Sequence, residues 1–242
     1  MRSISSAHSI LGFSVVLWLS FAAVNPPMAQ PRGAVPSRPN ASPSNEDQPA
    51  ASETPATARK PIQPIGARTV IACDGPFAKD SGMLTLAMVY GSQNMIFAEE
   101  KVQGTNVGMT VLYPKDPKRR LEVWWSNPNR TGLYLIDIAG KSVWTGPNGL
   151  RLGLTLPAVE KLNHKPFKLK GFDKDGVATV TNWDDGALAA LPGGCRAGAS
   201  FHADPKSSKD AVSAISADNE FSSDDRSIQA VKPTVSEILV GY

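Results

Sequence analysis

The chain has 242 residues and a formal net charge of +3, and hydrophobic residues make up 41% of it. This apolar share is that of a soluble globular protein, so the composition excludes a wholly disordered chain and a multi-spanning membrane protein. The small charge excludes the concentrated basic excess of nucleic-acid-binding proteins, and we expect no nucleic-acid partner.

The first thirty residues have the order of a secretory signal peptide. Arg2 precedes an apolar run at 10–24, prolines 26 and 27 break this run, and Ala29-Gln30 offers a cleavage site. We therefore predict a signal peptide over 1–29 and a periplasmic or secreted mature protein. A retained membrane anchor is the alternative, but this run falls short of the roughly twenty apolar residues that span a bilayer. We expect no stable membrane span after processing.

Residues 30–65 are rich in proline, alanine, serine and threonine, with no apolar periodicity of helix or strand. Such a segment buries too little apolar surface to offset its ordering entropy, which predicts a disordered linker. The linker is either a spacer that holds the domain off a membrane or wall, or unselected padding behind the leader.

Two cysteines, Cys73 and Cys195, bracket most of the well-patterned sequence. In an oxidising compartment such a pair is most simply one disulfide. A closed loop of this length, about 120 residues, is worth nearly 5 kcal/mol in the chain-entropy treatment, before native strain reduces it. A reactive or metal-bound thiolate is the alternative, but neither cysteine has a neighbouring histidine or second cysteine.

The first half of the globular domain, predicted over 66–202, consists of apolar segments joined by short turns. The pattern predicts five strands, at 83–90, 93–98, 107–113, 119–125 and 133–138. Connections this short favour antiparallel pairing, because a parallel crossover needs a dozen or more residues.

The second half contains the one convincing helix pattern. Thr155 is a suitable N-cap, proline at 157 falls in the tolerated first turn, and Pro166 ends the helix. Leu156, Val159 and Leu162 recur at helical spacing, so we expect them to form the buried face.

A strand and a hairpin follow this helix. Phe167 and Leu169 alternate with lysines, and the turn at 173–176 leads into a strand at 177–183, because Asp-Gly supplies the positive φ values of a tight hairpin. Residues 203–242 are polar and are predicted to be a mostly disordered tail, with an apolar patch at 235–240 that fits an edge strand. The predicted fold class is α+β: a mainly antiparallel sheet with one short helix, one disulfide and disordered termini.

The segment at 149–186 resembles a recurring stretch in exported bacterial proteins of unknown function. The shared features are a Gly-x-x-x-Gly-x-Thr-Leu lead-in at 149–156, a short helix to Asn163, Lys-Pro-Phe at 165–167, Gly171-Phe172, and Trp183 followed by Gly186. This chain departs from the pattern by placing His164 where glycine is usual and Asp173-Lys174-Asp175 where a glycine-rich turn is common. The lead-in also resembles that of small outer-membrane assembly lipoproteins, although no lipid-carrying cysteine lies near the leader. Neither resemblance implies a catalytic residue.

Signatures of catalysis and metal binding are sparse. Glu160 and His164 share a helix face, but two ligands are too few for zinc and a surface pair is the simpler interpretation. The aspartates at 173, 175, 184 and 185 suggest calcium, yet Gly176 falls at the wrong position of a calcium loop and no closing glutamate follows. Nucleophile and phosphate-loop motifs are absent. We expect no catalytic residue, metal site or cofactor.

The candidate binding residues are Trp124, Arg120 and Lys118. Adjacent tryptophans on a strand point to opposite faces, so Trp125 on the apolar face leaves Trp124 beside Arg120 and Glu122. An outward tryptophan next to basic residues suits a sugar ring or a partner protein. The alternative is that the second half covers this face and buries Trp124 in the core.

These features favour a non-enzymatic periplasmic binding or envelope-associated module whose partner is an envelope protein or a glycan. The alternative is a small cell-wall hydrolase or an inhibitor of one, because the carboxylate pair of a glycoside hydrolase can lie anywhere in a sequence.

Overall fold

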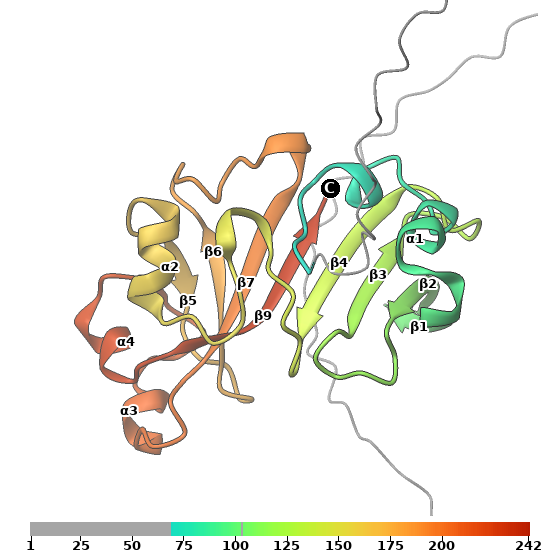
Figure 1. Ribbon diagram of the computed structural model, residues 1–242. Helices are drawn as coiled ribbons and strands as arrows, with labels where there is room; N and C mark the ends of the chain where they lie inside the picture. The colour runs from blue at the N-terminus through green and yellow to red at the C-terminus, as the bar shows by residue number, and fades with distance from the viewer. Residues whose placement is uncertain (1–68, 103) are drawn as a thin grey trace, which may run out of the picture. The chain divides into compact units, whose positions relative to one another are not determined.

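A computed structural model describes residues 69–102 and 104–242 (Figure 1). The predicted signal peptide at 1–29, the whole predicted linker at 30–65 and the first three residues of the predicted domain lie outside the described residues. Within the described ranges, no helix is long and apolar enough to cross a membrane.

The strands of the described chain form one antiparallel sheet. They are β1 (Met95–Val102), β2 (Thr105–Leu112), β3 (Leu121–Trp125), β4 (Leu133–Ala139), β5 (Lys168–Lys170), β6 (Val177–Asn182), β7 (Arg196–His202), β8 (Glu220–Ser222) and β9 (Thr234–Gly241). Their order across the sheet is β1-β2-β3-β4-β9-β7-β6-β5-β8. The prediction of a mainly antiparallel sheet is confirmed.

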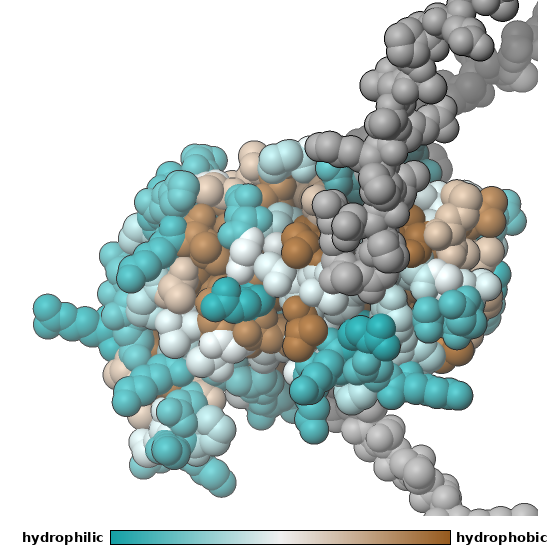
Figure 2. All heavy atoms as spheres, in the orientation of Figure 1, coloured by the Kyte–Doolittle hydropathy of each residue, from teal (hydrophilic) through white to brown (hydrophobic). Residues whose placement is uncertain are grey.

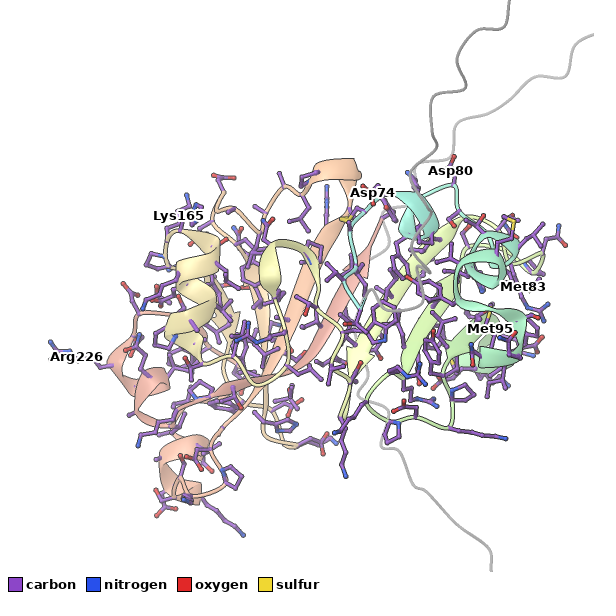
Figure 3. The ribbon with its side chains drawn as sticks, in the orientation of Figure 1. Asp74, Asp80, Met83, Met95, Lys165 and Arg226 are labelled. Carbon is purple, nitrogen blue, oxygen red and sulfur yellow. A yellow bond between two sulfur atoms is a disulfide. The ribbon has the colours of Figure 1, made fainter. Side chains whose placement is uncertain are left out.

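The described residues contain four α-helices rather than the one predicted. They are α1 (Met83–Tyr90), α2 (Leu156–Asn163), α3 (Lys209–Ser213) and α4 (Arg226–Ala230), and single 3-10 turns lie at Gly75–Phe77, Ser92–Asn94, Pro147–Gly149 and Pro192–Gly194. In Figure 1, α1 and α2 lie at opposite ends of the sheet. Met83 and Met95 mark one end in Figure 3, and Lys165 and Arg226 mark the other.

The prediction of a strand at 83–90 is wrong, because this segment is helix α1. In a strand, residues 84, 86, 88 and 90 would share one face. Instead Leu86 and Tyr90 are buried, whereas Leu84 and Met88 are 68% and 74% exposed. A short, continuously apolar run cannot be assigned to helix or strand from periodicity alone, and its methionines, leucines and alanine favour helix.

Each half of the sheet consists of a helix followed by a meander. The amino half, residues 83–139, contains α1 and β1 to β4, which match the other four predicted strands with shifted ends. The carboxyl half, residues 156–241, contains α2, then β5, β6 and β7, and returns through α3, β8 and α4 to β9. The last strands of the two halves, β4 and β9, pair at the centre, with Ile138 opposite Ile238.

One face of the sheet forms the hydrophobic core. Its side chains include Val123, Ile136, Ile138, Ile238 and Val240, none more than 1% exposed. The buried residues of both long helices belong to the same cluster, so we call this side the helix-side face. The predicted helix face is partly confirmed: Leu156 and Val159 are fully buried, but Leu162 is only half-buried, and Asn163 is buried in its place.

The prediction of a disordered tail over 203–242 does not hold, because this segment forms α3, β8, α4 and β9. Its few apolar residues are far apart in sequence, yet Ile215, Ile228 and Val231 are each buried against the carboxyl half. Ile215 is held by backbone bonding to Phe172. The patch at 235–240 lies in β9, the central strand of the sheet, and not at an edge.

The predicted disulfide between Cys73 and Cys195 is present, with the two Cα atoms 6.0 Å apart. Both residues are buried. The bond joins the segment that precedes α1 to the residue just before β7 in the carboxyl half. Gly193 permits this approach, because a Cβ there would lie 2.1 Å from the Cys73 carbonyl oxygen.

Candidate functional site

The adjacent tryptophans of β3 point to opposite faces, as predicted. Trp125 is 2% exposed, and its Nε1 donates to Thr110 Oγ1 at 2.9 Å. Trp124 remains partly exposed outside the core cluster, and its Nε1 is buried without a hydrogen-bond partner. Trp124 is therefore not a core residue.

Strand pairing places Trp124 on a face that we call the helix-free face. Trp124 lies between Met109 on β2 and Leu135 on β4, and the next row is Glu122, Asp137 and Leu239. Its members from β2 to β7 include Val107, Met109, Val111, Glu122, Trp124, Leu135, Asp137, Glu237, Leu239, Arg196 and Ser200. The buried residues of the described helices belong to the opposite, helix-side face.

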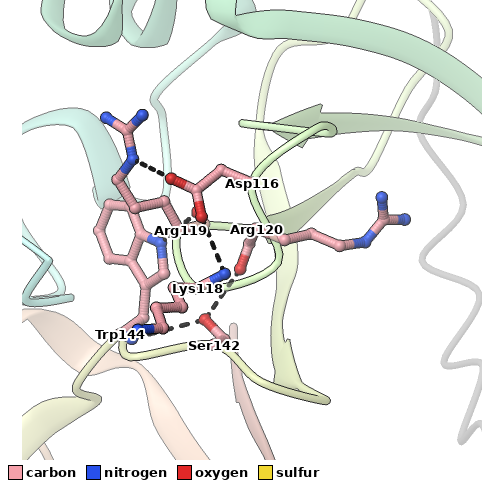
Figure 4. Close-up of polar contacts among 6 residues, drawn as sticks. All are labelled: Asp116, Lys118, Arg119, Arg120, Ser142 and Trp144. Atoms are coloured by element: carbon pink, nitrogen blue, oxygen red, sulfur yellow. Dashed lines mark hydrogen bonds and ion pairs between the residues drawn. The ribbon is translucent and has the colours of Figure 1, made fainter.

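The basic turn before β3 is tightly held (Figure 4). Asp116 accepts hydrogen bonds from the Arg119 Nε at 2.7 Å and from the Lys118 backbone N–H at 3.0 Å. The Ser142 hydroxyl and the Trp144 indole donate to the carbonyl oxygens of Arg120 and Arg119. The side-chain bond from Arg119 lowers the pKa of Asp116. The turn is thus fixed in shape, with the side chain of Lys118 left exposed.

The structure does not bring the three predicted binding residues into one cluster. Arg120 is paired with Glu122 through its Nε, 3.1 Å from Oε1, and through a second nitrogen. A strand rises about 3.3 Å per residue, so Trp124 lies about 13 Å from Arg120 along β3, with Glu122 between them. Lys118 is farther still. Of the three residues, Trp124 alone is central to the helix-free face.

The sequence interpretation missed a row of carboxyl groups beside Trp124. Asp137 lies directly opposite Glu122, and Glu237 on the neighbouring strand accepts a hydrogen bond from Ser200 Oγ at 3.1 Å. Burial, together with the nearby carboxylates of Glu237 and Glu122, raises the pKa of Asp137 to about 8 against the opposing effect of Arg120. The alternation within 235–240 was the one signal that could have placed Glu237 on a strand face.

The remaining candidates have structural roles or open surroundings. Glu160 and His164 line a shallow hollow of about 300 Å³ at the end of α2, together with Pro157, Lys161, Lys165 and Pro166. Asp173 Oδ1 accepts the backbone N–H groups of Asp175 and Val177, which makes it a turn-forming residue. In the described part of the chain, no group of three or more His, Cys, Asp or Glu residues is placed to hold a metal ion.

Several residues of the segment at 149–186, which resembles exported bacterial proteins, fix the carboxyl end of α2 through hydrogen bonds and close packing. Asn163 is fully buried, and its side-chain amide donates to the carbonyl oxygens of Lys165 and Trp183 and accepts from the Leu188 N–H. A Cβ at Gly186 would lie 2.1 Å from Asn163 Oδ1. His164 has a left-handed backbone with φ of 66°, which explains why glycine suits this position.

No protein-family model, curated protein or solved structure significantly matches this chain.

Proposed function

We propose that this protein is a non-enzymatic, exported binding module that holds an envelope protein or glycan on its helix-free face, with Trp124 as the anchor. The observation that carries the proposal is the state of Trp124: a partly exposed indole outside the core, with an unpaired Nε1 donor. An indole combines a large apolar area with one hydrogen-bond donor, a combination enriched where proteins bind partners.

Two features support export. The disulfide between Cys73 and Cys195 is of the kind that persists in oxidising compartments such as the periplasm. The sequence pattern at 1–29 is that of a signal peptide, which would direct the chain to that compartment.

The shape of the helix-free face supports binding rather than turnover. Small-molecule and catalytic sites are typically concave, and the hollow described above lies at α2 rather than beside Trp124. A broad sheet face suits a polymer or a protein surface.

One observation favours a second candidate, a glycan hydrolase. Directly opposed residues on antiparallel strands have Cβ atoms about 5 Å apart, so Glu122 and Asp137 form a close carboxyl pair. The raised pKa of Asp137 keeps it protonated near neutral pH, as a general acid requires. The pairing of Glu122 with Arg120 weighs against free use of Glu122 as a nucleophile.

Affinity capture from envelope extract with crosslinking tests the proposal. We expect wild type to capture a defined protein or glycan, and Trp124→Ala to lose it. Phe97→Ala is the matched control, because Phe97 is 49% exposed but pairs with Thr110 on the helix-side face. Equal capture by all three proteins would contradict the proposal. Clearing of peptidoglycan in a zymogram, abolished by Asp137→Asn, would instead support the hydrolase.

A further inference from the structure

We infer that the partner presents an extended, lysine- or arginine-rich peptide segment, which lies across the helix-free face beside Trp124. This inference rests on the proposed function and names the chemistry of its partner.

The charge of the face is the first argument. Glu100, which pairs with Val107, joins Glu122, Asp137 and Glu237 on this side of the sheet. The arginines beside these carboxyl groups are Arg120, which precedes β3 and is already paired with Glu122, and Arg196 on β7. With Asp137 protonated near neutral pH, the three glutamates still outnumber the two arginines around Trp124, whereas the chain as a whole carries a net charge of +3. A cationic partner is complementary to this local excess.

Two orphaned polar atoms are the second argument. Trp124 Nε1 is a donor and Asp137 Oδ1 is an acceptor, and both are buried without a partner. They lie on neighbouring strands and on the same face, two positions apart in the pairing register. A peptide backbone presents a carbonyl oxygen and an N–H at every non-proline residue, so one segment can satisfy both atoms.

The apolar neighbours of the carboxyl groups are the third argument. Met109, Leu135 and Leu239 adjoin Trp124 and Asp137 in the pairing register. Such a surface accepts the methylene stems of lysine and arginine while the charged heads reach the carboxylates. In an extended peptide, alternate side chains are about 6.6 Å apart, which is close to the roughly 7–8 Å between the diagonal neighbours Asp137 on β4 and Glu237 on β9. Alternating basic residues therefore match this pair of carboxyl groups.

Binding of synthetic peptides to the full chain tests the inference. The probe is a fluorescein-labelled dodecapeptide of alternating lysine and alanine, and its control has glutamate in place of lysine. Both are measured by fluorescence anisotropy, and the Trp124 indole N–H is followed by NMR and identified with Trp124→Phe. We expect saturable binding of the lysine peptide alone, weakened at least tenfold as salt is raised from about 50 to 500 mM, with the Trp124 signal shifted.

Variants locate the site. Glu237→Gln should weaken binding of the lysine peptide about tenfold, and Asp137→Asn should do so at pH 9, where Asp137 has lost its proton. Glu99→Gln removes the same charge from the same sheet, but Glu99 is exposed and lies on the opposite side of β1 from Glu100. Its affinity should stay within about twofold of wild type. Binding should also tighten between pH 6 and 9 as Asp137, facing Glu237, Glu122, Glu100 and Arg120, loses its proton.

Each other outcome overturns the inference. Equal binding of the glutamate peptide, or a Glu99→Gln loss as large as that of Glu237→Gln, would show nonspecific attraction. Binding of a glucosamine hexamer in place of the lysine peptide would assign the face to a cationic glycan. Binding of the lysine peptide only after removal of residues 1–68 would make the basic segment around Arg59 and Lys60 the occupant. None of these outcomes decides the proposed function. That function is tested separately, by whether the Trp124→Ala variant loses the partner that wild type captures from envelope extract.

Discussion

The amino half of the sheet builds its four strands consecutively between residues 95 and 139, whereas the carboxyl half interrupts its meander with α3, β8 and α4 before β9 returns to the centre. Both halves place a helix on the same side of the sheet and an aromatic cluster beneath it. In the amino half, Tyr90 of α1 packs against Trp144, which in turn packs against Phe77, and both of these residues flank that half in the sequence. In the carboxyl half, Phe167 packs against Trp183 and Phe201. Similar layouts thus arise from local pairing in one half and from a long-range return in the other.

The largest expected effect follows from that return. Removing residues 234–242 deletes β9 and its buried Val235, Ile238 and Val240. Each such side chain is worth about 1.5–3 kcal/mol, so the loss approaches the roughly 5–15 kcal/mol by which whole domains are stable. We expect no cooperative unfolding transition in either half, measured by calorimetry and near-UV circular dichroism. An amino half that still unfolds cooperatively would show that the halves are independent.

Substitution of each of the adjacent tryptophans compares how much the two faces of the amino half contribute to stability. Trp125→Ala should lower the free energy of unfolding by about 3–5 kcal/mol, because it removes a buried aromatic and leaves Thr110 without its partner. Trp124→Ala should cost about 1 kcal/mol, because its side chain is already partly in water. Urea denaturation of both variants measures the difference. Equal costs would mean that the helix-free face is also a packed core.

The stability of the carboxyl half depends on the hydrogen bonds of the Asn163 side chain at the end of α2. Asn163→Ala leaves the carbonyl oxygens of Lys165 and Trp183 and the Leu188 N–H without their partner. We expect a loss of about 2–4 kcal/mol by urea denaturation, since unpaired buried groups are costly. Asn94→Ala is the control from the amino half, where one side-chain bond to the Tyr90 carbonyl is lost. It should cost about 1 kcal/mol.

The stability of the protein should depend on pH through Asp137, which lies on β4 where the two halves pair. Its pKa is about 8 in the folded protein and about 3.9 in the unfolded chain, so the folded state binds the extra proton between these values. The stability that this proton provides is complete below about pH 4 and falls as the pH rises to about 8. Asp137→Asn should therefore be more stable than wild type by at least about 2 kcal/mol at pH 8, with the gap closing towards pH 4. A gap independent of pH would contradict this.

The smallest expected effect compares the ends of the two long helices. α1 ends at Gly91 with φ of 81°, whereas α2 ends at His164 with φ of 66°. His164→Gly should raise stability by about 1 kcal/mol, because glycine adopts positive φ without a steric penalty. Gly91→Ala should lower it, since a side chain is strained at this positive φ whatever the surrounding space. Melting temperatures of the two variants should move in opposite directions.

The sequence predicted the elements whose partners are close in the chain. The strands from 107 to 138 and the hairpin at 173–176 depend on alternation and turn residues, and both are local signals. The helix at 83–90 was missed because its apolar residues occur on all sides, with Leu84 and Met88 left exposed. The carboxyl elements were missed because their anchors, such as Ile215 and Ile228, are single apolar residues whose partners lie far away in sequence.

The candidate site follows the same rule: its local feature was predicted from the sequence, and its long-range neighbours were not. The alternation of apolar and polar residues on β3 correctly assigned Trp124 and Trp125 to opposite faces, because the whole pattern lies within five residues. The neighbours Asp137 and Glu237 could not be placed, since the pairing of β4 with β9 joins positions about one hundred residues apart. The sequence therefore identified one side chain of the face but not its surroundings.

The position of β9 also affects the order in which the protein can fold. Synthesis runs from the amino end, so the strand that completes the centre of the sheet is the last part of the described chain to appear. Until then, β4 has an unpaired edge, and the partner of Ile138 is missing. The complete sheet thus forms only after its other eight strands have been synthesised, and this delay suits the proposed export, because a chain that has not finished folding can still pass through a narrow membrane channel.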